Sequence, residues 1–161
     1  MLRIVAALLV VIGLVGCSIE SDGIGQTGES DQGLGFVAAQ SDADFAALLN
    51  PLRANAGLPA AVADARLFAA AQAFADDMVA RDYFSHTTPD GGTLGSRLAA
   101  AGFSQCGAAE NIAFGNSSPA GAFNVWMESG PHRSNLLFTG NVAFGIGHAG
   151  DKTVLIVARP C

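Results

Sequence analysis

Two histidines and one glutamate have the side chains best suited to metal or acid–base chemistry in this sequence. His86 follows a long helical pattern, His132 follows the segment around Trp126, and Glu110 lies between them. Two imidazoles and a carboxylate can form an incomplete shell for Zn²⁺, with water in the remaining position. The same three groups also suit general acid–base catalysis. Spacing alone leaves a third interpretation open, in which both histidines are loop residues bonded to nearby backbone.

The sequence contains none of the short motifs that identify common enzymes. It has no G-x-S-x-G, no P-loop, no G-x-G-x-x-G that opens a helix and no H-E-x-x-H. Ser85, Ser129 and Ser134 lie near the histidines in sequence and are candidate nucleophiles. A nucleophile also needs a base, an orienting group and an oxyanion hole in fixed geometry, and no motif here supplies all three. A hydrolase therefore stays an alternative to a binding protein.

Length and charge exclude several classes of protein. The chain has 161 residues, which is enough for one domain of ordinary size. It carries 8 Lys and Arg against 14 Asp and Glu, for a net charge of −6, and Lys152 is its single lysine. This balance argues against nucleic acid or an anionic membrane surface as the partner. No segment after the N-terminus reaches the run of about 18 apolar residues that a membrane-spanning helix needs, which excludes a polytopic membrane protein.

The N-terminus has the pattern of an export signal that ends at a cysteine. Arg3 precedes an apolar run over residues 4–15, and Gly16-Cys17 follows. This ending resembles the bacterial lipobox, which implies cleavage after residue 16 and acylation of Cys17 with palmitate-type chains. Acyl chains would anchor the protein in a lipid bilayer, since each buried CH₂ contributes about 0.8 kcal/mol. An ordinary secretory signal followed by an unrelated cysteine is the alternative.

The resemblance to a lipoprotein also predicts where the protein is located. Ser18 stands where inner-membrane retention signals of Gram-negative bacteria place Asp. The expected location is therefore the bacterial cell envelope, at the outer membrane if the cell is Gram-negative, facing the periplasm or the exterior.

Composition divides the chain into three parts. Residues 1–16 are the predicted signal peptide, and residues 17–41 are a linker of Gly, Ser, Gln and acidic residues without a base. Such a segment buries too little apolar surface to offset its ordering entropy, so a solvated tether is expected. Residues 42–161 form the predicted folded domain. Its first helix is expected to begin at a Ser41 cap, with Asp44 three residues later.

Hydrophobic periodicity predicts helices early in this domain and strands at its end. The expected helices cover residues 41–56, 64–82, 93–102 and 118–128, and the expected strands cover residues 110–114, 141–147 and 153–157. Pro51 is expected to kink the first helix or to remove one of its backbone hydrogen bonds. Helices packed on a small antiparallel sheet give the α+β class. Phe123 and Trp126 are expected in the core. His148 falls in the predicted turn between the last two strands and is expected at the surface.

Six segments occur in an order that resembles a known family. They are Leu49–Pro59, Tyr83–His86, Glu110–Gly115, Trp126–Ser129, His132–Leu137 and Gly145–Gly147. Together they resemble the CAP superfamily, which shares the SCP-domain fold of cysteine-rich secretory proteins, antigen 5 and pathogenesis-related 1, in its single-domain bacterial branch. The resemblance covers residues 42–160. It implies a three-layer α-β-α sandwich with a central antiparallel sheet and a cleft open to solvent.

The resemblance also implies a set of cleft residues. In the family, two histidines and two glutamates line the cleft, and some members hold a divalent metal through the histidines. His86, Glu110 and His132 match three of these four positions, so His86 and His132 are the expected ligands of a metal such as Zn²⁺. The second glutamate is expected where Ser129 stands. Glu128 is one position early, and on a helix this step turns its side chain by about 100°.

Other polar residues are expected to support the framework. Asn50, Arg53 and Asn135 are predicted to form hydrogen bonds that hold the cleft residues in place. Cys106 and Cys161 are the two thiols of the folded domain, and export to an oxidising compartment favours a disulfide between them. A reactive free Cys161 is the alternative.

Two function classes follow from these observations. The first is an envelope-anchored binding module whose cleft takes a divalent metal, a small or lipid-like molecule, or another envelope component. The second is a metal- or serine-dependent extracytoplasmic hydrolase, either a peptidase or an esterase.

Overall fold

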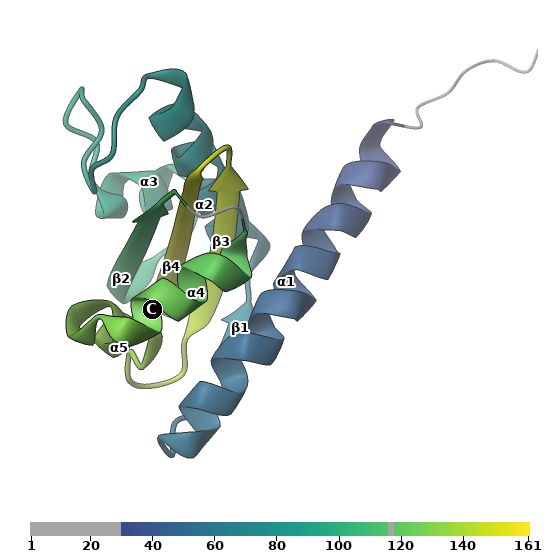
Figure 1. Ribbon diagram of the computed structural model, residues 1–161, viewed down its shortest axis with the longest axis vertical. Coiled ribbons are helices and arrows are strands. Elements are labelled where there is room, and N and C mark those ends of the chain that lie inside the picture. The colour runs from purple at the N-terminus through teal and green to yellow at the C-terminus, as the bar shows by residue number, and fades with distance from the viewer. Residues whose placement is uncertain (1–29, 116–117) are drawn as a thin grey trace, which may run out of the picture.

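The described part of the chain contains five helices and a four-stranded sheet (Figure 1). The computed structural model describes residues 30–115 and 118–161, with residues 30–42 described by their backbone alone. The helices are α1 (Ser30–Asn55), α2 (Ala65–Ala80), α3 (Leu94–Ala100), α4 (Pro119–Glu128) and α5 (Gly130–Leu136), and the strands are β1 (Val62–Ala63), β2 (Gln105–Phe114), β3 (Ala143–Ala149) and β4 (Lys152–Pro160). The predicted signal peptide and Cys17 lie outside the described residues.

The sheet has the strand order β1-β3-β4-β2. β4 pairs antiparallel with β3 and with β2, as the sequence predicts for the three long strands. β1 is an addition: its two residues pair parallel with β3, which makes the sheet mixed. Both residues of β1 are exposed, so no alternation of apolar and polar residues marked this short strand in the sequence. The α+β class is confirmed.

Helices cover both faces of the sheet (Figure 1). One apolar cluster lies between the sheet and helices α1, α4 and α5, and it contains the fully buried Trp126 together with Phe123. The second cluster lies between the sheet and helices α2 and α3, and it contains Phe74 and Leu98. Two separate cores on opposite faces of one sheet give the three-layer α-β-α arrangement.

Helix α2 lies very close to β3 because β3 carries two glycines. A Cβ atom at Gly145 would collide with the backbone of Leu67, and one at Gly147 would collide with the backbone of Gln72. Any larger residue at either position would push the helix away from the sheet. These glycines therefore set the spacing between the central sheet and α2.

The N-terminal boundary of α1 differs from the sequence-based expectation. The helix begins at Ser30 and not at Ser41, so part of the predicted tether is helical. It also continues through Pro51, although this residue removes one backbone hydrogen bond. On the inner side of this turn, Phe45, Leu49 and Arg53 are buried, and their packing holds the helix together across the proline.

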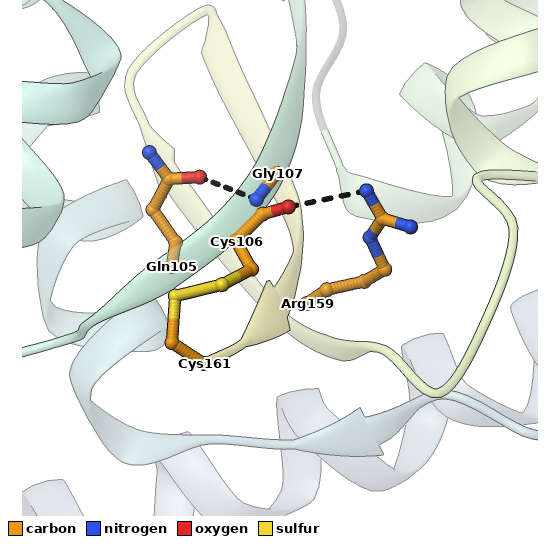
Figure 2. Close-up of a disulfide and its surroundings, with 5 residues drawn as sticks. All are labelled: Gln105, Cys106, Gly107, Arg159 and Cys161. Carbon is orange, nitrogen blue, oxygen red and sulfur yellow. Dashed lines mark hydrogen bonds between the residues drawn. A yellow bond between two sulfur atoms is a disulfide. The ribbon is translucent and has the colours of Figure 1, made fainter.

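Two smaller expectations about the end of the chain have different outcomes. His148 belongs to β3, is half-buried, and its Nδ1 lies 2.9 Å from the Thr153 hydroxyl, so its assignment to an exposed turn was wrong. The predicted disulfide between Cys106 and Cys161 is confirmed, and it joins the beginning of β2 to the end of the chain (Figure 2). Beside it, Arg159 Nη2 donates to the Cys106 carbonyl at 3.1 Å.

Candidate functional site

His86 and Glu110 form the centre of the candidate site. His86 lies in the loop between α2 and α3, and Glu110 lies on β2 opposite Ile156 of β4. His86 Nδ1 is 2.9 Å from Glu110 Oε1. The imidazole side chain is 56% exposed, whereas the carboxylate side chain is only 4% exposed. The glutamate thus lies behind the histidine and orients a ring that faces solvent.

Arg97 of α3 completes this centre. Its Nη2 lies 2.5 Å from Glu110 Oε2, so both carboxylate oxygens have partners. Its Nη1 donates to the carbonyls of His86 and Gly92 at 3.2 and 3.3 Å. The guanidinium carbon lies 3.5 Å from the centre of the Phe74 ring, a cation–π contact. The Arg97 side chain therefore contacts the Glu110 carboxylate, the backbone of His86 and the loop that joins His86 to α3.

Sequence reasoning missed Arg97. The sequence signal that could have identified it is the absence of any other charged residue around it. It is the single charged residue of α3, whose other residues are Leu, Gly, Ser and Ala, and it follows the His86 loop directly. A lone cation on such a short apolar helix, close in sequence to a candidate acid, suggests an ion pair across the fold.

The loop that carries His86 is held by its own hydrogen bonds. Thr88 Oγ1 accepts from the Gly92 amide at 2.7 Å, and the Gly91 amide donates to the Thr88 carbonyl at 2.8 Å. Gly91 has φ of 89°, which favours glycine in this turn. Together with Arg97, these bonds fix the path of the loop from which the imidazole extends.

His132 lies on α5, next to the same strand. Its backbone carbonyl accepts from Asn111 Nδ2 at 3.0 Å. The ring atom Nδ1 is buried and has no hydrogen-bond partner among the described residues. His86 and His132 thus attach to neighbouring residues of β2, the first through the side chain of Glu110 and the second through that of Asn111.

Side chains from α4 and α5 occupy the outer edge of β2. Asn135 Nδ2 donates to the Glu110 carbonyl at 3.2 Å, and Trp126 Nε1 donates to the Ile112 carbonyl at 3.2 Å. β2 is an outer strand of the sheet, and its unpaired carbonyls would otherwise need water or another strand. The expected framework role of Asn135 is confirmed by these contacts.

Arg53 and Asn50 also have the framework role that the sequence predicted. Arg53 is fully buried, and its guanidinium donates to four backbone carbonyls, those of Pro59, Leu136, Phe138 and Gly140. Burial lowers the pKa of this guanidinium from its ordinary value. Asn50 exchanges two hydrogen bonds with the backbone of Ala61. Asn50 therefore connects α1 to the segment before β1, and Arg53 connects it both to that segment and to the end of α5 and the loop after it.

Glu128 does not join the site in the described structure. It is the last residue of α4, its side chain is exposed, and no hydrogen bond or ion pair of the described residues includes it. Ser129, at the expected position of the second glutamate, is the residue where α4 ends and α5 begins. Within residues 30–115 and 118–161, no three or more His, Cys, Asp or Glu side chains are grouped so that they could hold a metal ion.

The candidate serine nucleophiles have local hydrogen bonds. Ser85 Oγ accepts from the Thr87 amide at 3.1 Å, and Ser134 Oγ donates to the Gly130 carbonyl at 2.9 Å. Neither bond involves His86 or His132. The described geometry therefore contains no serine–histidine pair of the kind that activates a hydroxyl nucleophile.

Two grooves lie on opposite sides of the domain. One, of about 460 Å³, lies between α2 and α3, and Phe74 and Arg97 form part of its wall. The other, of about 380 Å³, lies between α1 and the beginning of α4, and Phe45 and Leu48 contribute to it. Arg97 therefore separates the first groove from Glu110.

Comparison with known proteins matches most of the folded domain. The family model for CAP, the cysteine-rich secretory protein family, matches residues 46–156. The chain is 34% identical over 107 residues to the uncharacterized protein YkwD of Bacillus subtilis (strain 168), and this match covers 66% of the chain and 42% of YkwD.

Solved structures give a similar result. An extracellular protein containing an SCP domain from Bacillus anthracis str. Ames has a TM-score of 0.69 and 29% identity, with 83% of this chain and 45% of that one covered. An outer surface protein from Borrelia burgdorferi has a TM-score of 0.64 and 18% identity, with 86% and 100% covered, which is a likeness of fold alone. The chain spans less than half the length of YkwD and of the Bacillus anthracis protein.

Proposed function

Since the chain belongs to the cysteine-rich secretory protein (CAP) family, we propose that it is an envelope-anchored binding module whose His86 and His132 take a divalent cation. The observation that carries this proposal is the hydrogen bond between His86 Nδ1 and Glu110 Oε1 at 2.9 Å. A buried carboxylate behind an exposed imidazole fixes the orientation of the ring, which is the arrangement that supports metal-binding histidines.

The proposed ligands are the two imidazoles. Nε2 of His86 and Nδ1 of His132 have no hydrogen-bond partner among the described residues. Both oxygens of Glu110 are already bonded to His86 and Arg97, so this carboxylate orients a ligand and does not serve as one. His86 and His132 would hold the ion, and water would complete its coordination. A bound Zn²⁺ would supply Lewis-acid character at the cleft.

Metal analysis of purified protein tests the proposal. The assay uses the full chain with Cys17→Ser, because this substitution removes a thiol that could itself bind Zn²⁺. We expect it to bind about one Zn²⁺ per chain, and His86→Ala with His132→Ala to abolish binding. His148→Ala is the matched control, because this third imidazole is bonded to Thr153 and lies outside the site. Equal Zn²⁺ retention in the double variant and in the control would overturn the metal site.

The anchoring part of the proposal rests on the sequence around Cys17 and on the location of a similar protein. The Bacillus anthracis protein with an SCP domain is extracellular. No helix within residues 30–115 and 118–161 is both long and apolar enough to cross a bilayer. We expect the wild-type chain to fractionate with the envelope and Cys17→Ser to be released from it. Retention of Cys17→Ser in the envelope fraction would contradict a lipid anchor.

A further inference from the structure

We propose that Arg97 is the positioning residue of this site. It keeps Glu110 aimed at His86, and thereby keeps His86 in the tautomer that carries its proton on Nδ1 and leaves Nε2 open to a ligand. This inference rests on the proposed function, because it says how the imidazole of the binding site is prepared. It concerns a residue of α3 that the family resemblance did not include.

The first argument is geometric. One guanidinium contacts both members of the histidine–glutamate pair, with Nη2 at 2.5 Å from Glu110 Oε2 and Nη1 at 3.2 Å from the His86 carbonyl. Nη1 also reaches the Gly92 carbonyl at the other end of the same loop. A planar group with fixed donor directions can align a carboxylate in a way that a flexible ammonium cannot. The orientation of Glu110 relative to His86 therefore depends on Arg97.

The second argument concerns charge. The Glu110 side chain is 4% exposed, and burial of a carboxylate is costly unless the group is paired with a cation and hydrogen-bonded. Arg97 supplies this cation, since its guanidinium carries a permanent positive charge and contacts Glu110 Oε2. An ionised carboxylate only accepts hydrogen bonds. The imidazole proton must therefore lie on Nδ1, and the lone pair of Nε2 remains available.

The third argument is that Arg97 is held in a place that costs stability. Its side chain is 12% exposed, and Nε is buried without a hydrogen-bond partner among the described residues. Leaving a buried donor unpaired is unfavourable. The ring of Phe74, 3.5 Å from the guanidinium carbon, fixes the plane of the group instead. In this plane the two terminal nitrogens point at Glu110 and at the His86 loop, and Nε is left unpaired. Such a loss of folding stability is expected at a functional site, where the orientation of a side chain matters more than its own hydrogen bonding.

Nitrogen NMR of the imidazoles tests the inference directly. In ¹⁵N-labelled full chain with Cys17→Ser, at mildly alkaline pH where ordinary imidazoles are neutral, we expect His86 to show an unprotonated Nε2 and a protonated Nδ1. Arg97→Gln should move His86 to a mixture of tautomers, and Arg97→Lys should restore part of the wild-type signal. His148, bonded to Thr153, should stay unchanged in every variant and serves as the reference within each sample.

Zn²⁺ affinity gives the second readout. Loss of a group that orients a metal ligand typically costs 10–100-fold in affinity, so we expect a decrease of about tenfold or more in Arg97→Gln and a smaller one in Arg97→Lys. Circular dichroism establishes that each variant is folded. If Arg97→Gln does not fold, Arg97→Lys, which keeps the charge and loses the planar fork, carries the test.

The outcomes separate this inference from the proposed function. If a folded Arg97→Gln keeps the wild-type His86 tautomer, or if wild-type His86 carries its proton on Nε2, the role of Arg97 is overturned even when Zn²⁺ binds. If the wild-type chain binds no Zn²⁺ and the tautomer still depends on Arg97, the proposed metal function fails and the positioning role stands.

Discussion

Asn135 of α5 and Asn111 of β2 share a hydrogen bond of 2.8 Å that joins the helix carrying His132 to the strand carrying Glu110. The same Asn135 amide donates to the Glu110 carbonyl, and the Asn111 amide donates to the His132 carbonyl. Asn111 is fully buried, so its amide has no water to replace a lost partner. The two asparagines therefore couple the position of His132 to that of Glu110.

Replacing Asn135 should destabilise the protein and loosen the candidate site. In Asn135→Ala, the Asn111 amide oxygen and the Glu110 carbonyl each lose a donor, which we expect to lower the free energy of unfolding by about 1–3 kcal/mol. Urea denaturation measures this change. Asn124→Ala is the matched control, because Asn124 is exposed on α4 and should change stability by less than about 0.5 kcal/mol. Equal effects of the two substitutions would mean that the asparagine pair is not a structural connection.

A larger effect is expected at Arg53. Its four carbonyl partners lie in two segments, one before β1 and one that begins at the last residue of α5, and all four would lose a charged donor in Arg53→Met. We expect a loss of at least about 3 kcal/mol, measured by thermal and urea unfolding. Arg66→Met is the control: that side chain is 51% exposed and pairs with Asp64, so its removal should cost much less than the removal of Arg53. A small effect at Arg53 would contradict its role as a buried connector.

Local sequence signals predicted much of the fold. The helix starts expected at residues 64, 93 and 118 agree with the structure, where each of these side chains bonds an amide within the first turn. The β3–β4 pair was readable because both strands are continuous apolar runs around one turn. The pairing of Cys106 with Cys161 followed from the number of cysteines and the exported setting. All of these depend on a few neighbouring residues or on composition.

The remaining features depend on contacts between distant segments. Arg97 is paired with Glu110 only because α3 packs on the face of β2 that carries this carboxylate, and a lone cation on α3 suggests an ion pair without specifying that packing. The start of α1 at Ser30 was missed because a favourable cap at Ser41 suggested a later beginning, and propensity alone determines helix ends poorly. Contacts between distant segments also determine the geometry of the site. The sequence could suggest that Glu110 and His86 belong to one site, but not which of their atoms form a hydrogen bond.

The glycines of β3 provide a test of the packing between sheet and helix. In Gly145→Ala, the new methyl group would overlap the Leu67 backbone, so α2 must move away from the sheet. We expect a loss of about 3 kcal/mol in the free energy of unfolding, since overpacking against rigid backbone cannot relax through side-chain motion. Gly130→Ala has nothing within 4 Å of the added atom and should cause no loss. Urea denaturation compares the two, and an unaffected Gly145→Ala would show that α2 does not need this close approach.

Tyr83, the single tyrosine of the chain, allows a prediction about pH. Burial, and then the hydrogen bond from its hydroxyl to Asp77 at 2.5 Å, raise the pKa of Tyr83 to about 12. The unfolded chain loses this proton near the ordinary tyrosine value of about 10. The folded state therefore binds more protons between these values, so this contribution to stability is complete below about pH 10 and is lost as pH rises toward about 12.

Tyrosinate absorbance in the near ultraviolet measures this titration without interference from a second tyrosine. We expect a wild-type midpoint near 12 and a lower midpoint in Asp77→Asn, which removes the charged acceptor but keeps the size of the side chain. Asp76→Asn is the matched control, since it removes one charge from the same turn of α2, and Asp76 is bonded to Gln72 and not to Tyr83. A wild-type midpoint near 10, or equal midpoints in Asp77→Asn and the wild type, would contradict the contribution of the Tyr83–Asp77 bond. Because Asp77 also pairs with Arg81 at 2.9 Å, the variant's thermal unfolding is measured at neutral pH to separate loss of that pair from the change in titration.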